Sequence, residues 1–235
     1  MRKMRNFPVH ASFMKVYFIS GMGADWRIYK YIQLPKGFEM EHLHWIPAEK
    51  GETLSAYALR LASRIDTREP FVLVGTSMGG MMSVEIAKRF PPAALVLISS
   101  IPVSSQMPGY LKLAKALRLT SMVPVPMLKK AATFKYFFSR EATNDKAMIR
   151  QLILESDNAF IQWAMGACLD WRNEEIPPFL SHIHGSRDEV FPIWLTRPTH
   201  KIRRAGHMMV MSHGRQVNAI IGEILEKATT GCLPA

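Results

Sequence analysis

A serine that could act as a nucleophile follows one of the apolar segments of this chain. Ser77 lies at the centre of the sequence G-T-S-M-G at residues 75–79, directly after the apolar run 71–74. A serine can attack a carbonyl carbon from the end of a strand only if a very tight turn presents it. Gly75 and Gly79 fit that requirement, because residues without side chains let the strand and the next helix approach closely. The pattern therefore predicts a nucleophile at a strand–helix turn.

An acid that could orient a catalytic histidine follows the apolar segment 179–184. The sequence G-S-R-D-E-V-F-P at residues 185–192 provides a turn, an acid and an apolar anchor. The carboxyl ends of parallel strands meet at one edge of a sheet, so an acid here can approach the serine turn. We assign the acid to Asp188, with Glu189 as the alternative.

A histidine that could serve as the base follows the segment 200–204. Of the 8 histidines, His207 lies beyond the end of a strand, after Gly206, which permits a sharp turn. Such a base would take the proton of the serine hydroxyl, while the acid holds the imidazole in the correct tautomer. His213 is the alternative base, although we expect it to cap the last helix.

Two backbone amides are candidates for the oxyanion hole, which stabilises the negative oxygen of an acyl-transfer intermediate. The first belongs to Met78, directly after the nucleophile. The second belongs to Met22, which lies between Gly21 and Gly23 in a glycine-rich turn after the first apolar run.

The elements that must position these residues are expected to alternate between strands and helices, which is typical of an α/β fold. Apolar runs without alternation indicate strands that are covered on both faces, as in parallel sheets. Strands are expected at 16–19, 38–46, 71–74, 94–99, 179–184 and 200–204, and helices at 26–31, 54–66, 78–90 and 213–227.

The alternation stops between 102 and 175, where only helical patterns are found. We expect helices at about 108–119, 125–138, 143–156 and 158–171, which together form an inserted helical cap. The core would then comprise 14–101 and 176–228, and residues 1–13 a flexible N-terminal arm. The first half of the cap has no acid between Pro102 and Arg140 but several basic residues: Lys112, Lys115, Arg118, Lys129, Lys130, Lys135 and Arg140.

Composition limits the class of protein further. The chain has 235 residues, 48% of them hydrophobic, and a formal charge of +11. No apolar run approaches the ~18 residues of a transmembrane helix, and no signal peptide is expected. Cys168 and Cys232 lie far apart without the spacing of a metal site, which favours a cytoplasmic location with structural thiols. We attribute the positive charge to a basic surface, since no nucleic-acid-binding motif accompanies it.

The chain resembles the α/β-hydrolase superfamily from residue 15 to about 227. The resemblance rests on S-G-M-G at residues 20–23, on G-T-S-M-G, and on the order Ser77, Asp188, His207 in their loops. It looks like the small bacterial hydrolases of unassigned substrate in that superfamily. Ser20 stands where many members have histidine, and the first two strands of the family are absent. The resemblance therefore implies a six-stranded, entirely parallel sheet, with 102–175 as a lid.

These residues predict two-step transfer of an acyl group to water, with a small-molecule ester or thioester as substrate and no metal or cofactor. The alternatives are a binding or signalling protein on a hydrolase scaffold, and C–C hydrolase, lyase or acyltransferase chemistry. We expect a monomer or homodimer that binds no nucleic acid. The basic half of the cap could attract anionic esters. An apolar acyl pocket, or simply the core of the cap, could be formed by Met107, Leu111, Met122, Met127, Phe134, Phe137, Phe138, Trp163 and Met165.

Overall fold

The computed structural model describes residues 13–117, 123–137 and 143–229. Several predictions made from the sequence lie outside the described residues. These are the arm before residue 13, Arg118, Met122, Phe138, Arg140, Cys232 and the side chains of Phe134, Lys135 and Phe137.

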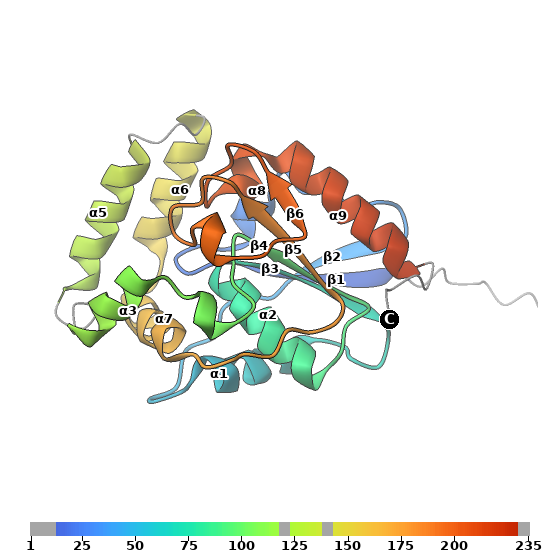
Figure 1. Cartoon of the computed structure of the whole chain (residues 1–235), viewed down its shortest axis with the longest axis horizontal. Coiled ribbons are helices and arrows are strands. Elements are labelled where there is room, and N and C mark those ends of the chain that lie inside the picture. Colours follow the sequence, from blue (N-terminus) through green and yellow to red (C-terminus); the bar gives the residue numbers. More distant parts are fainter. Residues whose placement is uncertain (1–12, 118–122, 138–142, 230–235) are drawn as a thin grey trace, which may run out of the picture.

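A single sheet forms the centre of the molecule (Figure 1). Its strand order is β2-β1-β3-β4-β5-β6, and each neighbouring pair is parallel. The prediction of a six-stranded, entirely parallel sheet is therefore confirmed. The strands are β1 (Met14–Ile19), β2 (Phe38–His42), β3 (Phe71–Thr76), β4 (Ala94–Ile98), β5 (Leu180–Gly185) and β6 (His200–Ile202).

Helices cover both faces of the sheet, which explains the unbroken apolar runs of its strands. Along β1, Tyr17 and Ile19 pack under α1 (Leu54–Leu61) and α2 (Met78–Arg89). Their neighbours Val16 and Phe18 belong to the opposite layer. That layer is closed by α8 (Met209–Ser212) and α9 (Gly214–Thr229). Alternate residues of a strand point to opposite faces, so one apolar run supplies two cores.

Some elements are shorter than the sequence indicated. The segment predicted as a helix at 26–31 is a 3₁₀ turn, Trp26–Tyr29. The last helix, expected at 213–227, is α9, and the separate short helix α8 precedes it and ends at His213. Gly214 begins α9 against the side chain of Tyr31, where a Cβ would lie 2.8 Å from the Tyr31 Cβ.

Four described helices lie between β4 and β5, beside the sheet in Figure 1. The side chain of Asp157 begins the last of them by accepting a 2.7 Å hydrogen bond from the Phe160 amide. In the same helix, Trp163 lies 4.5 Å from the ring of Tyr57 in α1, measured between centroids. These helices are α3 (Gly109–Ala116), α5 (Val125–Phe137), α6 (Thr143–Glu155) and α7 (Asn158–Asp170).

Two basic side chains of this inserted region have internal partners. Lys129 is buried and donates to the carbonyls of Leu154 and Ser156 at the end of α6. Lys115 pairs with Asp170. Both charges therefore stabilise the packing of the helices. In the part of the chain that the model covers, no helix combines the length and apolar character needed to cross a bilayer.

Candidate active site

Ser77 occupies a strained turn between β3 and α2. Its φ of 55° and ψ of −122° are uncommon for a residue with a side chain. A Cβ at Gly79 would collide with the carbonyl oxygens of Ile19 and Ser20, and one at Gly75 with the carbonyl of Gly79. The two glycines therefore allow the close approach that holds the serine turn against the end of β1.

Ser77, His207 and Asp188 come together at the carboxyl edge of the sheet. The Nε2 atom of His207 lies 3.0 Å from the Ser77 Oγ. On the other side of the ring, Nδ1 lies 3.0 Å from each carboxylate oxygen of Asp188. Asp188 and His207 are only 4% and 8% exposed. Ser77 follows β3, Asp188 follows β5 and His207 follows β6, as the sequence indicated.

The surroundings of Asp188 favour its ionised form. Burial raises the pKa of this carboxyl group, but the charge and hydrogen bond of His207, the amide of Phe191 and the charge of His184 together lower it below its usual value. An ionised carboxylate only accepts hydrogen bonds, so Nδ1 of His207 carries the proton. Nε2 is then left to accept the hydrogen of the Ser77 hydroxyl.

The alternative acid and base have other contacts. The Glu189 carboxylate accepts a 3.3 Å hydrogen bond from the backbone amide of His207, not from its ring. The Nδ1 atom of His213 lies 3.0 Å from the hydroxyl of Ser212, at the end of α8. Neither residue takes part in the contacts between Ser77 and Asp188.

The glycine-rich loop after β1 packs directly on Ser77. A Cβ added at Gly21 would lie 3.2 Å from the Ser77 Cβ, so Met22 is held close to Ser77. The loop closes on Ala24, whose amide donates to the Gly21 carbonyl at 3.1 Å. The Ala24 carbonyl accepts hydrogen bonds from the Ser20 hydroxyl at 3.0 Å and from Trp45 Nε1 at 2.9 Å. On the other side of Ser77, Met78 is the first residue of α2.

A pair of buried histidines behind Asp188 was not assigned a role from the sequence. His182 and His184 are 1% and 0% exposed, and their Nε2 and Nδ1 atoms lie 3.1 Å apart. His184 Nε2 lies 2.7 Å from the Phe191 carbonyl and 3.6 Å from Asp188 Oδ2. The signal was present as H-x-H in an otherwise apolar strand, because residues two apart share one face.

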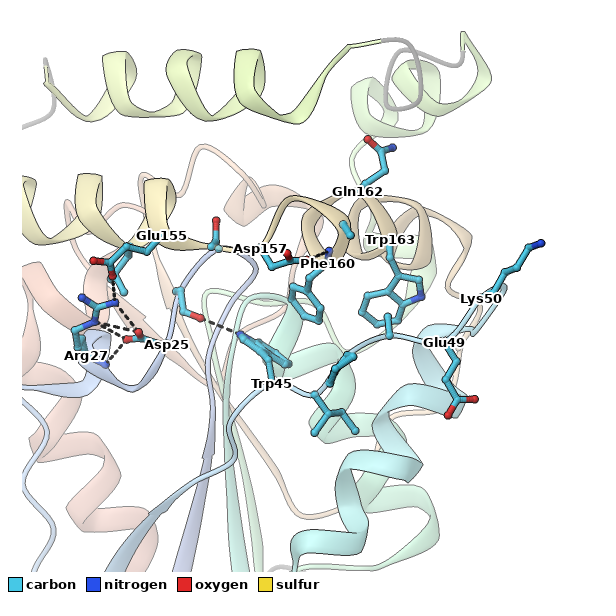
Figure 2. A pocket seen from close by; sticks show the side chains of 18 of the residues that line it. Asp25, Arg27, Trp45, Glu49, Lys50, Glu155, Asp157, Phe160, Gln162 and Trp163 are labelled. Carbon is cyan, nitrogen blue, oxygen red and sulfur yellow. Dashed lines mark hydrogen bonds and ion pairs between the residues drawn. The ribbon is translucent and has the colours of Figure 1, made fainter.

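A groove of about 950 Å³ lies next to the loop after β1. We call it the aromatic groove, after the side chains of Trp45, Phe160 and Trp163 that line it. Figure 2 shows these side chains facing one another between α7 and the segment 45–51. Gly23 and Ala24 complete its wall on the side of the loop. Among the predicted pocket residues whose side chains are described, Trp163 lines this groove.

The His, Cys, Asp and Glu side chains of the described residues form no metal site. Within residues 13–117, 123–137 and 143–229, no group of three or more His, Cys, Asp or Glu is arranged to hold a metal ion. Cys168 is buried and unpaired, and burial raises the pKa of its thiol to about 12. The thiol therefore remains protonated and unreactive at neutral pH.

Solved structures with the same architecture include several esterases. A thermophilic esterase from Thermogutta terrifontis has a TM-score of 0.67 and 19% identity, with 92% of this chain and 91% of that one covered. A structure from work on carboxylesterases of Nitrososphaera gargenis has a TM-score of 0.70 and 17% identity, covering 94% and 93%. MenH from S. aureus has a TM-score of 0.66 and 16% identity, covering 92% and 94%.

Sequence comparison places the chain in a family. No curated protein matches it significantly. The family model described as the alpha/beta hydrolase family matches residues 17–220, which is most of the chain and includes all the residues brought together at the edge of the sheet. The protein therefore belongs to the alpha/beta hydrolase family.

Proposed function

We propose that the protein is a serine hydrolase that cleaves the ester or thioester bond of a small molecule through an acyl-enzyme. One observation carries this proposal. The Ser77 hydroxyl, the His207 imidazole and the Asp188 carboxylate form a continuous chain with 3.0 Å contacts on both sides of the ring. This is the order that nucleophile, base and orienting acid require.

In the first step, the Ser77 Oγ attacks the carbonyl carbon while His207 Nε2 takes the hydroxyl proton. The imidazolium that results is stabilised by the ionised Asp188. His207 then gives this proton to the departing alcohol or thiol, and Ser77 keeps the acyl group. In the second step, water gives a proton to His207 and attacks the acyl carbon, which releases the acid and restores Ser77.

The backbone amides of Met22 and Met78 donate hydrogen bonds to the negative oxygen of each intermediate. The amide of Met78 lies at the positive end of the α2 dipole, where anions are stabilised. Met22 follows Gly21, which contacts Ser77. Losing one donor of such a pair typically lowers the rate by about 10²–10³-fold.

The test is hydrolysis of 4-nitrophenyl acetate by wild type and by Ser77→Ala, with circular dichroism to confirm folding. We expect the variant to lose turnover and to lose covalent labelling by a fluorophosphonate probe. Ser63→Ala is the control, because Ser63 is exposed in the turn after α1 and its hydroxyl donates to the carbonyl of Arg60. Full turnover by folded Ser77→Ala would falsify the assignment. Failure of the wild type to react with the probe would instead favour a binding protein on a hydrolase scaffold.

A further inference from the structure

We propose that the aromatic groove binds an uncharged, apolar substituent of the ester that Ser77 attacks, such as an aromatic ring or a medium-length alkyl chain. This inference rests on the proposed function and specifies its substrate class. Its first support is position. A Cβ at Gly21 would lie 3.8 Å from the Ser77 Oγ, and Gly23, two residues later, already lines the groove.

That spacing sets the length of substituent that can reach the groove. Two residues of chain span at most about 7 Å, so the groove wall begins within roughly 12 Å of the hydroxyl. We therefore expect a longer chain or a fused ring on the same carbonyl to reach the groove more readily than the single methyl of an acetyl group.

The second support is the chemistry of the walls. The ring centroid of Phe160 lies 5.1 Å from that of Trp45 and 5.4 Å from that of Trp163, so the three rings form a continuous surface. Ala159 and Ile46 add further apolar lining. The volume of about 950 Å³ is in the range of small-molecule sites, which are mostly apolar.

The third support is that the carboxylates and the guanidinium that line the groove already have partners within the protein. Arg27 pairs with Asp25 at 2.8 Å and with Glu155 at 2.6 Å, as the dashed lines of Figure 2 show. Asp157 accepts a hydrogen bond from the Phe160 amide at the start of α7, and Glu49 pairs with Arg60 at 3.5 Å. Lys50 is exposed and extends away from the rings in Figure 2. A carboxylate or phosphate on the substituent would therefore have to break existing ion pairs, whereas an uncharged group would not.

The experiment fills the groove. Ala159 is an exposed lining residue of α7, so Ala159→Trp adds bulk without entering the core. We expect the KM for 4-nitrophenyl octanoate and for 1-naphthyl butyrate to rise at least 10-fold, and that for 4-nitrophenyl acetate to change less than 2-fold. Ala147→Trp, at an exposed position of α6 outside the groove lining, is the matched control. An unchanged KM for both long substrates, or an equal rise for acetate, would overturn the proposal.

A binding measurement separates this inference from the proposed function. In Ser77→Ala, calorimetry should detect 4-nitrophenyl octanoate binding that Ala159→Trp weakens at least 10-fold and Ala147→Trp does not. That result would support the groove even if the wild type hydrolysed nothing. Absence of binding, or binding that Ala159→Trp leaves unchanged, would reject the groove while leaving the role of Ser77 to its own test.

A different observation supports a second inference: we infer that His184 is a positioning residue for Asp188. A carbonyl oxygen only accepts hydrogen bonds, so His184 Nε2, which lies 2.7 Å from the Phe191 carbonyl, carries a proton. Its Nδ1 then accepts from Nε2 of His182. Burial keeps both rings neutral by lowering their pKa values, so each has one defined tautomer.

Phe191 transmits this constraint to the active site. Its carbonyl accepts from His184, and its amide donates to Asp188 Oδ1 at 2.8 Å. Its ring also packs edge-on against the imidazole of His207, with centroids 5.7 Å apart. His184 therefore fixes the residue that orients both the carboxylate and the base.

The test removes and then restores the donor at Nε2. His184→Leu should lower kcat by about 10–100-fold with KM changed less than 2-fold, since small misplacements of catalytic groups have effects of this size. His184→Gln places an amide donor near the former Nε2 and should recover kcat to within about 5-fold. If His184→Leu does not fold, His184→Asn makes the comparison, because its shorter amide does not reach Phe191.

Two results would reject a positioning role: wild-type kcat in folded His184→Leu or His184→Asn, or a kcat in His184→Gln no better than in those variants. A proton NMR spectrum provides a readout that does not depend on turnover. The downfield signal of the proton between His207 Nδ1 and Asp188 should shift or broaden in His184→Leu and return in His184→Gln. An unchanged signal in His184→Leu would count equally against the inference.

Discussion

The hydroxyl of Ser100 donates a 2.6 Å hydrogen bond to the backbone carbonyl of Ser77. The two serines follow neighbouring strands, β3 and β4, and Ser100 is fully buried. A Cβ at Gly80 would collide with the Ser100 Oγ, so the close packing of this turn extends beyond Gly79. The strained backbone of Ser77 is therefore held from the side of β4 as well as from β1.

Ser100→Ala tests this support. The Ser77 carbonyl also accepts from the amide of Gly80 at 2.9 Å, so it is not left without a partner. We expect the free energy of unfolding to fall by about 1 kcal/mol, the typical contribution of one hydrogen bond. The rate of ester hydrolysis should fall as well, because the serine turn is less firmly held. Urea unfolding and kcat measure the two effects, with Ser63→Ala as the control. Unchanged values of both would show that the turn needs no such support.

The parallel sheet and the three residues of the candidate site could be predicted because each depends on local patterns. Unbroken apolar runs mark strands buried on both faces, and a catalytic side chain must follow such a run at its carboxyl end. Asp188 and His207 met that condition in loops with small residues. Their separation in the sequence did not matter, since the sheet brings its strand ends together.

The end of β2 and the aromatic groove could not be predicted, because both depend on contacts between residues far apart in the sequence. β2 was expected to extend to Ile46 but ends at His42, opposite the last residues of β1. Beyond it, the amide and carbonyl of Ile46 bond the hydroxyl of Tyr57 instead of a strand. The aromatic groove combines Trp45 with residues more than 100 positions later, and no local pattern relates them.

Gly79→Ala should destabilise the protein severely. The added methyl group would meet two backbone carbonyl oxygens at the end of β1, which cannot move without displacing the strand. We expect a loss of about 3 kcal/mol or more, at the upper end of the cost of overpacking. Gly166→Ala is the matched control in another helix, because a Cβ there meets nothing within 4 Å. It should raise stability by up to about 1 kcal/mol through helix propensity. Thermal unfolding should show a lower midpoint for Gly79→Ala and a higher one for Gly166→Ala than for wild type. Equal midpoints for the two variants would contradict the steric argument.

Ser20→Ala should loosen the loop that holds Met22. The variant removes one of the two hydrogen bonds that the Ala24 carbonyl accepts and leaves the one from Trp45. We expect kcat for 4-nitrophenyl acetate to fall by about 3–30-fold with little change in KM, which is less than the 10²–10³-fold loss of an entire oxyanion donor. A rise in KM at constant kcat would instead assign Ser20 to substrate binding.

The buried histidines should make stability depend on pH. Burial, together with the charge of His184, lowers the pKa of His182 from 6.5 to about 3. Above pH 6.5 the ring is neutral in the folded protein and in the unfolded chain, so its titration does not change the free energy of unfolding. As the pH falls from 6.5 towards 3, the unfolded chain takes up a proton that the folded protein does not, and stability declines. The slope reaches about 1.4 kcal/mol per pH unit for each ring that behaves this way.

The lowered pKa of Asp188 affects stability at lower pH. The stability that the ionised Asp188 contributes is present above the unfolded pKa of about 3.9 and is lost as the pH falls through the lower folded value.

Urea unfolding of wild type and His182→Gln at pH 7.0, 6.0 and 5.0 isolates the contribution of this ring. The variant should be less stable than wild type at pH 7, because it loses the packing and the hydrogen bond to His184. Its stability should nevertheless fall less steeply towards pH 5, since one proton uptake has been removed from the unfolded state. Parallel curves for His182→Gln and wild type would contradict this account, because they would mean that His182 gains its proton as readily in the folded protein as in the unfolded chain.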